Sequence, residues 1–429
     1  MNSVQSSVTS NQLEGKRPLP EGWVWRVVKD CGTVVTGTTP SKKDPANYGD
    51  YIPFVKPPEL RNSSVYSAED NLSERGAKSA RVLPPSSVLV SCIGNLGKIG
   101  INRVPVAFNQ QINSIIFAKE IMPEFGFYYF QSSEFKEFLE GISSATTVTI
   151  VNKSKFESLP FPLPPLPAQE RIVARLEELL SDLEAGVTAL ERVRAGVKRY
   201  KVSVLKAACE GKLFGDKGIE NGELPEGWRW AKIDEIADTI GGVTKGRNLT
   251  GKATIMLPYL RVANVQRGRL DLDVMKEIEI LASEAEKYRL QDGDVVLTEG
   301  GDWDKLGRSA IWRNQIPNCI HQNHIFRART KSSYVLPEWL MYYTNSEQGQ
   351  NYFKEAAKQT TNLASINLTQ LRACPIPLPP LEEQRRIVAE VELRLESARA
   401  VESAVKTGLK RAAWLRQAVL RSAFEGRLS

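Results

Sequence analysis

The sequence predicts two compact α/β domains, each followed by a long α-helix, with the two helices packed as an antiparallel coiled-coil-like pair. An internal duplication and two matching amphipathic helical patterns lead to this fold class. Three segments of the first half return in the same order in the second: LPEGWVW (19–25) as LPEGWRW (224–230), FPLPPLPAQERIVARL (161–176) as IPLPPLEEQRRIVAEV (376–391), and SVLKAACEGKL (203–213) as AVLRSAFEGRL (418–428). A period of about two hundred residues is too long for a solenoid repeat, so it indicates two similar domains in pseudo-twofold arrangement.

Length and composition are those of an ordinary soluble globular protein, with 429 residues, of which 41% are hydrophobic and 25% are charged. No apolar run approaches the roughly 20 residues that a membrane helix needs. Residues 1–18 are polar and read as a flexible leader, because they lack the apolar region of a signal peptide. The five cysteines are scattered and form no CxxC pair. We therefore expect a reduced, cytoplasmic protein without disulfides.

Each copy divides into a globular part and a helical part. The globular parts alternate β-branched runs and turn signals with short helical patches, which is typical of a compact α/β domain. Proline clusters then precede an apolar stripe at spacings of three and four residues, flanked by charges, as in a coiled-coil seam. The expected boundaries are a leader over 1–18, globular domains over 19–160 and 224–375, long helices over 161–215 and 376–429, and a linker over 216–223.

Spacings between repeated letters show which parts have diverged. Gln169 and Glu210 are 41 positions apart, and Gln384 and Glu425 are also 41 apart, whereas the globular parts differ by ten residues, 150 from Leu19 to Gln169 against 160 in the second copy. The helices have thus kept their length while the domains drifted. At 1.5 Å per residue each helix should be roughly 60 Å long. An antiparallel pair would hold the two domains at opposite ends.

Two segments come near the motifs of nucleotide or methyl-transfer enzymes without matching them. Lys56-Pro57-Pro58-Glu59 has a base and a carboxylate where an adenine methyltransferase loop needs an amide and an aromatic residue, so we interpret it as a turn. The segment 94–99, GNLGKI, has the wrong glycine spacing for a P-loop and no hydroxyl after its lysine. It is more simply a loop between strands.

Candidate metal sites are equally weak. Glu284, Glu286 and Lys287, with Asp271 or Asp273, resemble a nuclease centre, yet a solvated helix face explains them more simply. The histidines at 321 and 324 lie close to Cys319, but the cluster lacks a fourth ligand and a common zinc spacing. We expect no metal, no cofactor and no catalytic site in this chain.

A basic, glycine-rich segment is the strongest candidate for nucleic-acid contact. A net charge of +7 is compatible with such a partner but does not establish one. Residues 241–270, however, hold six Lys/Arg, five Gly and no Asp or Glu, which is typical of a loop that approaches phosphates and guanine edges. The alternative is a solvated basic loop. The candidate contacts here are Lys245, Arg247, Asn248, Arg261, Arg267 and Arg269, with Lys42 and Lys43 as a weaker counterpart in the first copy.

Three further pairs of segments are candidates. Amide clusters at 109–111 and 322–323 stand between apolar stretches, where they would read adenine or, equally, cap strands and turns. Polar loops precede each proline cluster, and a Leu-Gly-Lys/Arg loop occurs in each copy. The residues concerned are Asn109, Gln110, Gln111, Gln322 and Asn323 in the first pair, Thr146 and Thr361 in the second, and Asn95, Lys98, Lys305 and Arg308 in the third.

Four tryptophans recur at the same offsets, and we interpret them as a shared packing anchor, with base stacking as the alternative. They are Trp23 and Trp25 in the first copy, and Trp228 and Trp230 in the second.

The layout resembles the specificity subunit of Type I restriction–modification systems from residue 19 onward. The motif IPLPPLEEQRRIV opens each long helix and EGRL closes it, with small departures in the first copy at Ala168 and Glu170. The resemblance implies that the globular parts are target recognition domains, each reading one half of a bipartite, asymmetric site in double-stranded DNA. It further implies that the helices bind two methyltransferase subunits, to which restriction motor-nuclease subunits attach.

Other interpretations remain open at this point. A methyltransferase-only complex would need the same specificity subunit. A protein scaffold without a DNA role would not bind duplexes in a salt-dependent way. A fused modification or nuclease enzyme would carry out chemistry as an isolated chain.

Overall fold

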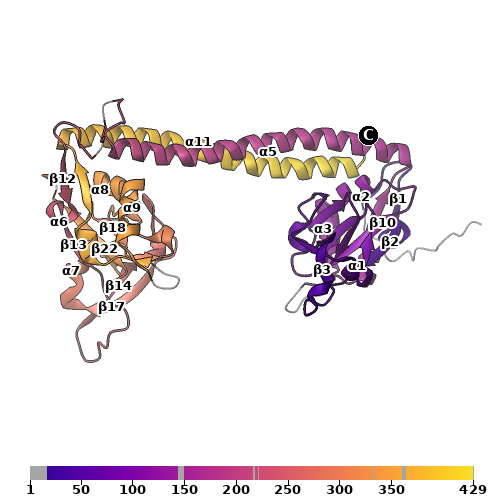
Figure 1. Cartoon of the computed structure of the whole chain (residues 1–429), viewed down its shortest axis with the longest axis horizontal. Helices are drawn as coiled ribbons and strands as arrows, with labels where there is room; N and C mark the ends of the chain where they lie inside the picture. Colours follow the sequence, from indigo (N-terminus) through magenta and orange to yellow (C-terminus); the bar gives the residue numbers. More distant parts are fainter. Residues whose placement is uncertain are drawn as a thin grey trace, which may run out of the picture. The chain divides into compact units, whose positions relative to one another are not determined.

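The computed structural model describes residues 17–143, 149–215, 218–220, 222–331, 333–359 and 364–428. The chain forms two compact units (Figure 1). Unit 1 spans Met1–Leu190 and Thr407–Ser429, and unit 2 spans Glu191–Lys406. Within the described ranges, no helix combines the length and the apolar character that a bilayer span requires.

Unit 1 is built on two sheets. The strands are antiparallel to their neighbours except in the pairs β4–β8 and β3–β9, which are parallel. The larger sheet has the order β2 (Gly32–Thr36), β10 (Ile112–Phe117), β7 (Val88–Ser91), β8 (Ile99–Asn102), β4 (Ser63–Val65), and the smaller has the order β5 (Asp70–Leu72), β3 (Tyr48–Val55), β9 (Val106–Phe108), β6 (Val82–Leu83). Its short helices are α1 (Glu74–Ser79), α2 (Pro123–Tyr129), α3 (Ser133–Gly141) and α4 (Lys153–Glu157).

Unit 2 repeats this architecture, which confirms the predicted duplication and the α/β class. Its main sheet has the order β13 (Ala237–Gly241), β22 (Ile325–Thr330), β18 (Val295–Thr298), β20 (Ser309–Ile311), and its second sheet has the order β17 (Lys276–Leu281), β14 (Thr254–Leu260), β21 (Ile320–His321). The pair β14–β21 is parallel, like β3–β9 in unit 1. The short helices are α6 (Ile233–Ile236), α7 (Ala285–Tyr288), α8 (Pro337–Asn345), α9 (Glu347–Ala356) and α10 (Leu368–Arg372).

Unit 2 also holds smaller strand pairs, and they correct one prediction. The pairs are β15 (Val265–Gln266) with β16 (Arg269–Leu270), and β19 (Gly300–Gly301) with β24 (Ala364–Ser365) and β23 (Lys358–Gln359). The segment 241–270 is therefore not one basic loop, because it contains β14 and the β15–β16 hairpin. The apolar run TIMLPYL within it pairs with β17 on one side and β21 on the other. The composition of the whole thirty-residue segment, rich in basic residues and glycine, did not reveal this short apolar strand.

The long helices α5 (Leu166–Cys209) and α11 (Leu381–Phe424) both have 44 residues, which confirms their predicted equal length. In unit 1 the start of α5 shares a core with the end of α11, through residues such as Ile172 and Leu420. In unit 2 the end of α5 shares a core with the start of α11, through residues such as Ala208 and Ile387. Within each unit the two chain directions are thus opposed. Glycines at positive φ, Gly211 and Gly426, follow the two helix ends.

Both helices begin later than the proline clusters suggested. The residues Pro160–Leu163 form strand β11, which pairs with β1 (Val24–Val27), and Pro375–Leu378 form β25, which pairs with β12 (Arg229–Lys232). Proline lacks a backbone N–H, and a two-stranded edge ribbon tolerates that loss. In each unit, the strand that follows the repeated LPEGW segment therefore pairs with the repeated proline segment in one two-stranded ribbon.

A buried glutamine explains the repeated Gln in the helix-start motif. The side chain of Gln169 accepts from the backbone N–H of Met122 at 2.9 Å and donates to the carbonyls of Glu120 and Pro164. Gln384 does the same, accepting from Leu336 N–H and donating to two carbonyls. Because a buried amide is costly unless it is hydrogen-bonded, this residue specifies how the helix start meets its domain.

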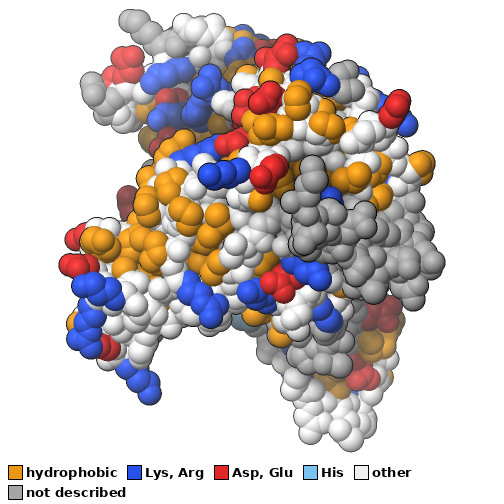
Figure 2. Space-filling model, turned by 90° about the vertical axis from the view of Figure 1, so that its right-hand side faces the viewer, with side chains coloured by type: hydrophobic (Ala, Val, Ile, Leu, Met, Phe, Trp, Pro, Cys, Tyr) orange, Lys and Arg blue, Asp and Glu red, His pale blue; other side chains and the backbone are white. Residues whose placement is uncertain are grey.

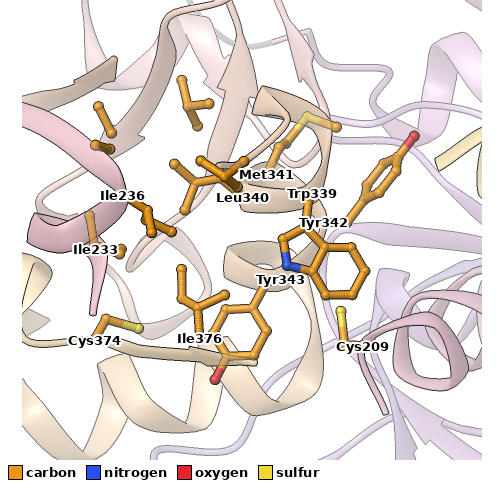
Figure 3. Packing of buried hydrophobic residues seen from close by; sticks show 14 of the residues in the cluster. Cys209, Ile233, Ile236, Trp339, Leu340, Met341, Tyr342, Tyr343, Cys374 and Ile376 are labelled. Atoms are coloured by element: carbon orange, nitrogen blue, oxygen red, sulfur yellow. The ribbon is translucent and has the colours of Figure 1, made fainter. Parts of the chain in front are cut away.

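The cores of the two units use equivalent positions, and side-chain sizes at two of these positions compensate for each other. In unit 1, Phe424 packs edge-on against Phe125 and Tyr129, with ring centroids 5.4 and 5.2 Å apart. Cys209 ends α5 where Phe424 ends α11, and Trp339 takes the place of Phe125. Figure 3 shows this cluster of unit 2, where side chains of α6, α8, β25 and the end of α5 meet. In unit 2 the larger ring of Trp339 on α8 thus accompanies the smaller Cys209 at the end of α5.

The repeated tryptophans divide between packing and exposure. Trp23 packs edge-on against Phe125, and Trp228 packs edge-on against Trp339, which confirms the packing role for this pair. Trp25 is half-buried against Phe138, with the Arg17 guanidinium over its ring. Trp230 is exposed, so the prediction is wrong for that residue. All five cysteines are buried free thiols, and burial raises the pKa of Cys209 to about 12.

Candidate nucleic-acid interface

Three of the predicted segments meet at one end of the main sheet in unit 1, together with residues 149–151. Strand β2 ends where β10 begins and where β7 ends, as the pairings Thr36–Asn113 and Ser91–Ile112 show. Backbone hydrogen bonds then join the connections: Thr38 N–H to Phe108 O, Cys92 N–H to Gln111 O and Gly94 N–H to Thr149 O, at 2.8–2.9 Å. We call the residues 37–43, 92–98, 109–111 and 149–151 the loop edge of unit 1.

The equivalent segments meet in the same way in unit 2. The backbone N–H of Val243 donates to His321 O, and Asn323 N–H donates to Val243 O, both at 2.9 Å. Glu299 N–H donates to His324 O, and Ile366 N–H donates to Glu299 O, both at 3.0 Å. The loop edge of unit 2 comprises residues 242–248, 299–308, 321–324 and 364–366. In both units, segments far apart in sequence form one surface, because antiparallel neighbours place alternate strand ends together.

Several predicted side chains are available at these edges. Among the described residues, none bonds to the side chains of Lys42, Lys43, Asn95, Lys98, Lys245, Gln322 and Asn323. Gln110 is exposed and accepts from the hydroxyl of Thr39. Available amides and ammonium groups are the types that read base edges and hold phosphates.

Other predicted residues are engaged in the fold. Asn109 bonds both to the side chain and to the backbone N–H of Gln111, which is the turn-capping alternative. Asn248 accepts from Thr250 N–H, and Lys305 pairs with Asp302. Thr146 and Thr361 lie outside the described residues.

Three of the predicted arginines are tied to neighbouring segments. Arg308 is only 8% exposed and donates to the side chain of Gln266 at 2.8 Å. Arg267 donates to the carbonyl of Asp304 and to the side chain of Gln350, and Arg261 donates to the carbonyl of Val274. These bonds hold the β15–β16 hairpin and the segment that leads into it. The three guanidinium groups therefore stabilise the fold, whether or not they also contact DNA.

Arg269 lies apart from the loop edge. It lines a hollow of about 1100 Å³ in unit 2, together with Val202 of α5, Tyr342 of α8 and Leu393 of α11. The prediction that it contacts DNA therefore places it on a different surface from Lys245 and Arg247. Figure 2 faces the side of Figure 1 on which unit 1 lies; there Lys and Arg are interspersed with Asp, Glu and apolar side chains, so positive charge is not gathered into one area of that face.

Arg247 is bound to an acidic partner that the sequence did not reveal. Its two terminal nitrogens donate to the carboxylate oxygens of Glu284 at 3.0 and 2.8 Å. The hydrogen bond lowers the pKa of Glu284 and raises the pKa of Arg247. Glu286 and Lys287 are exposed, as a solvated face predicts, but Glu284 is not free.

Sequence reasoning also missed three side chains at the loop edges. Glu299 Oε2 lies 2.5 Å from the ring Nδ1 of His324, within hydrogen-bond distance, and Trp303, four residues after Glu299, is exposed. In unit 1, Arg81 donates to Thr36 O and its backbone N–H donates to the hydroxyl of Thr38. Glu299 was missed because an acidic side chain is not expected on a surface predicted to contact DNA. Among the described residues, no group of three or more His, Cys, Asp and Glu is placed to hold a metal.

His321 gives the fold a pH dependence. Its ring is fully buried, with Nδ1 2.9 Å from the carbonyl of Ile325, and burial lowers its pKa from 6.5 to about 4. The unfolded chain takes up this proton below about pH 6.5, whereas the folded chain does not until about pH 4. The contribution to stability is therefore complete above pH 6.5 and is lost as the pH falls.

We expect the free energy of unfolding to fall by about 2 kcal/mol between pH 7 and pH 5 through this residue. Urea unfolding of the wild type and of His321→Phe at both pH values measures how much of the change in the free energy of unfolding comes from this residue. If the variant loses as much stability between pH 7 and pH 5 as the wild type, the imidazole is not held neutral.

The comparison with known families settles the identity of the two units. A family model described as the Type I restriction modification DNA specificity domain matches the chain twice, over residues 20–192 and 225–392. The chain belongs to the family of Type I restriction–modification DNA specificity subunits. Each match covers one globular domain and the start of the long helix that follows it, so the resemblance inferred from the helix motifs is confirmed.

Named members of this family are similar over nearly the whole chain. The Type I restriction enzyme StySPI specificity subunit of Salmonella potsdam is 26% identical over 425 residues, covering 96% of this chain and 90% of that protein. The EcoKI specificity subunit of Escherichia coli K12 is 26% identical over 436 residues, with the same coverage. A solved structure from a study of complex assembly in the type I R-M system has a TM-score of 0.73 at 23% identity, covering 96% of this chain and all of that one. The shared fold therefore includes the long helices.

Proposed function

We propose that this specificity subunit recognises a bipartite, asymmetric site in double-stranded DNA, with one half-site read by each loop edge. The observation that carries the proposal is the meeting of the predicted segments at one end of each main sheet. The two edges share their backbone plan but differ in side chains, for example Gln110–Gln111 against Gln322–Asn323. Two similar but unequal surfaces suit a site whose halves differ in sequence.

The domains 19–160 and 224–375 would then be the two target recognition domains. Direct readout needs donors and acceptors that are not already satisfied within the protein. The unbonded amides and ammonium groups at the loop edges meet that requirement, whereas Arg267 and Arg308 already donate to other parts of unit 2.

The long helices are proposed to dock two methyltransferase subunits, with restriction subunits attaching to these in a complete system. Exposed apolar side chains support this role, since Trp414 is 70% exposed on α11 in unit 1 and Leu393 is 64% exposed on α11 in unit 2. Val193, Val401 and Leu415 of the predicted stripe are also exposed. Exposed apolar side chains on a helix surface mark an interaction face.

The subunit itself is proposed to be non-catalytic. We expect the purified chain alone to bind duplex DNA weakly and to transfer no methyl group. Together with its methyltransferase partner, it should direct adenine methylation to a split, asymmetric site.

Methylome sequencing of cells that carry both subunits identifies the site, and duplex titration at several salt concentrations tests the binding. Methyl transfer by the isolated chain would refute the non-catalytic role. Duplex affinity of the complex that does not fall with salt would refute the DNA contact and favour a protein scaffold.

A further inference from the structure

The ion pair between Arg247 and Glu284 joins two segments of unit 2 that are distant in sequence. Arg247 belongs to the loop edge, four residues after Val243, which pairs with Gln322. Glu284 ends the short 3-10 turn Ala282–Glu284, whose first N–H donates to the carbonyl of Ala253. The Glu284 carboxylate therefore lies on a separate segment, which is held by its own backbone hydrogen bond.

The geometry of the pair leaves part of the guanidinium available. Each terminal nitrogen gives one N–H to Glu284, at 3.0 and 2.8 Å. A guanidinium has five N–H groups, so the Nε–H and one N–H on each terminal nitrogen remain. No described residue accepts from the Nε–H. The side chain is 29% exposed and its partner 26%, so that edge is open to a ligand.

The charges around the pair favour an acceptor-rich, negatively charged ligand. Lys252 and Lys287 lie close enough to Glu284 to lower its pKa further, and Lys245 is exposed nearby in the sequence. A lone carboxylate would repel phosphates, but Arg247 neutralises it. What remains is a planar donor edge within a basic surrounding.

We propose that Glu284 is a positioning residue that orients Arg247 for bidentate recognition of a guanine in the half-site read by unit 2. The Nε–H and the adjacent terminal N–H match the O6 and N7 acceptors of guanine in the major groove. Because the carboxylate fixes the plane of the guanidinium before DNA arrives, less side-chain freedom is lost on binding. This inference rests on the proposed function and adds a named contact and its support.

A purely structural ion pair would brace the loop without affecting base choice. The test therefore measures base preference. The full chain, assembled with its methyltransferase partner, methylates a duplex library in which every position of both half-sites is varied. The variants are Arg247→Lys, Arg247→Ala, Glu284→Gln, Glu284→Ala and the double alanine variant. Glu286→Gln is the matched control, because Glu286 lies in the next turn and pairs with Arg289 away from the loop.

We expect both Arg247 variants to lower the preference for guanine at one position about tenfold. Glu284→Gln should lower it at the same position by a smaller factor, and the double variant should be no worse than Arg247→Ala alone. The control should retain the wild-type preference. Thermal unfolding of each variant separates loss of folding from loss of readout, and Arg247→Lys keeps the charge where alanine destabilises the loop.

Preference that is unchanged in folded Glu284 and Arg247 variants would overturn the inference while the proposed function stands. A change at different positions for the two residues, or in the other half-site, would also overturn it. If the wild-type complex methylates without sequence preference, the proposed function itself fails.

Discussion

Lengthening both long helices by four residues is expected to lengthen the unread spacer of the DNA site by one or two base pairs, with both half-site sequences unchanged. Four residues add about 6 Å and about 400° of rotation, so the apolar stripe nearly returns to register. Base pairs are about 3.4 Å apart along each strand, which gives the one or two extra pairs. Suitable insertion points are after Val193 in α5 and after Lys406 in α11, between the contact of Leu190 with Gly408 and the Lys201–Glu402 ion pair.

Two-residue insertions at the same points are the control. They rotate the stripe by about 200°, which turns its apolar side outward, and they should abolish methylation instead of shifting the spacer. Methylome sequencing of cells carrying each variant with the partner subunit measures both outcomes. An unchanged spacer in an active four-residue variant would show that the helices do not set the gap.

The residues that end the two long helices are expected to be non-interchangeable. Phe424→Cys would leave a cavity beside Phe125 and Tyr129, and should lower the free energy of unfolding by about 3 kcal/mol. Cys209→Phe would force a ring into the core that already holds Trp339, at a cost of about 1–3 kcal/mol. Each change copies the other unit's residue into the wrong surroundings.

Urea unfolding of the full chain measures both effects. Adding Phe125→Trp to Phe424→Cys recreates the combination found in unit 2 and should recover part of the lost stability. Leu415→Ala, at an exposed position on α11, should change stability by less than about 0.5 kcal/mol. Equal stability of Phe424→Cys and the wild type would contradict the complementary packing.

The parts of the fold that the sequence predicted are those set by local pattern and by repetition. The equal helices followed from matched spacings. The candidate segments were found from their equal positions in the two copies, but their meeting at one end of each main sheet was not predicted. The β11 and β25 strands were missed because prolines suggest a helix start, and only their pairing with β1 and β12, which follow the LPEGW segments, makes them strands.

Partners across long sequence separations could not be predicted. A count of charges identifies Arg247, Arg267 and Arg308 as basic, but it does not reveal that one is held by Glu284 and two are fixed by neighbouring side chains. Gln169 was visible as a repeated letter, yet its role as a buried bridge depends on residues almost fifty positions earlier.

The discontinuity of unit 1 has a consequence for how the chain is made. Unit 2 is continuous, from Glu191 to Lys406, whereas the core of unit 1 needs Leu420, Ala423 and Phe424 from the end of α11. A ribosome that adds about 5–20 residues per second completes unit 2 before it releases those residues. The N-terminal part of unit 1 therefore keeps some of its apolar surface uncovered until the end of α11 is made. Unit 2 is translated later but can complete its fold earlier. Chaperone binding during synthesis should accordingly concentrate on the N-terminal unit.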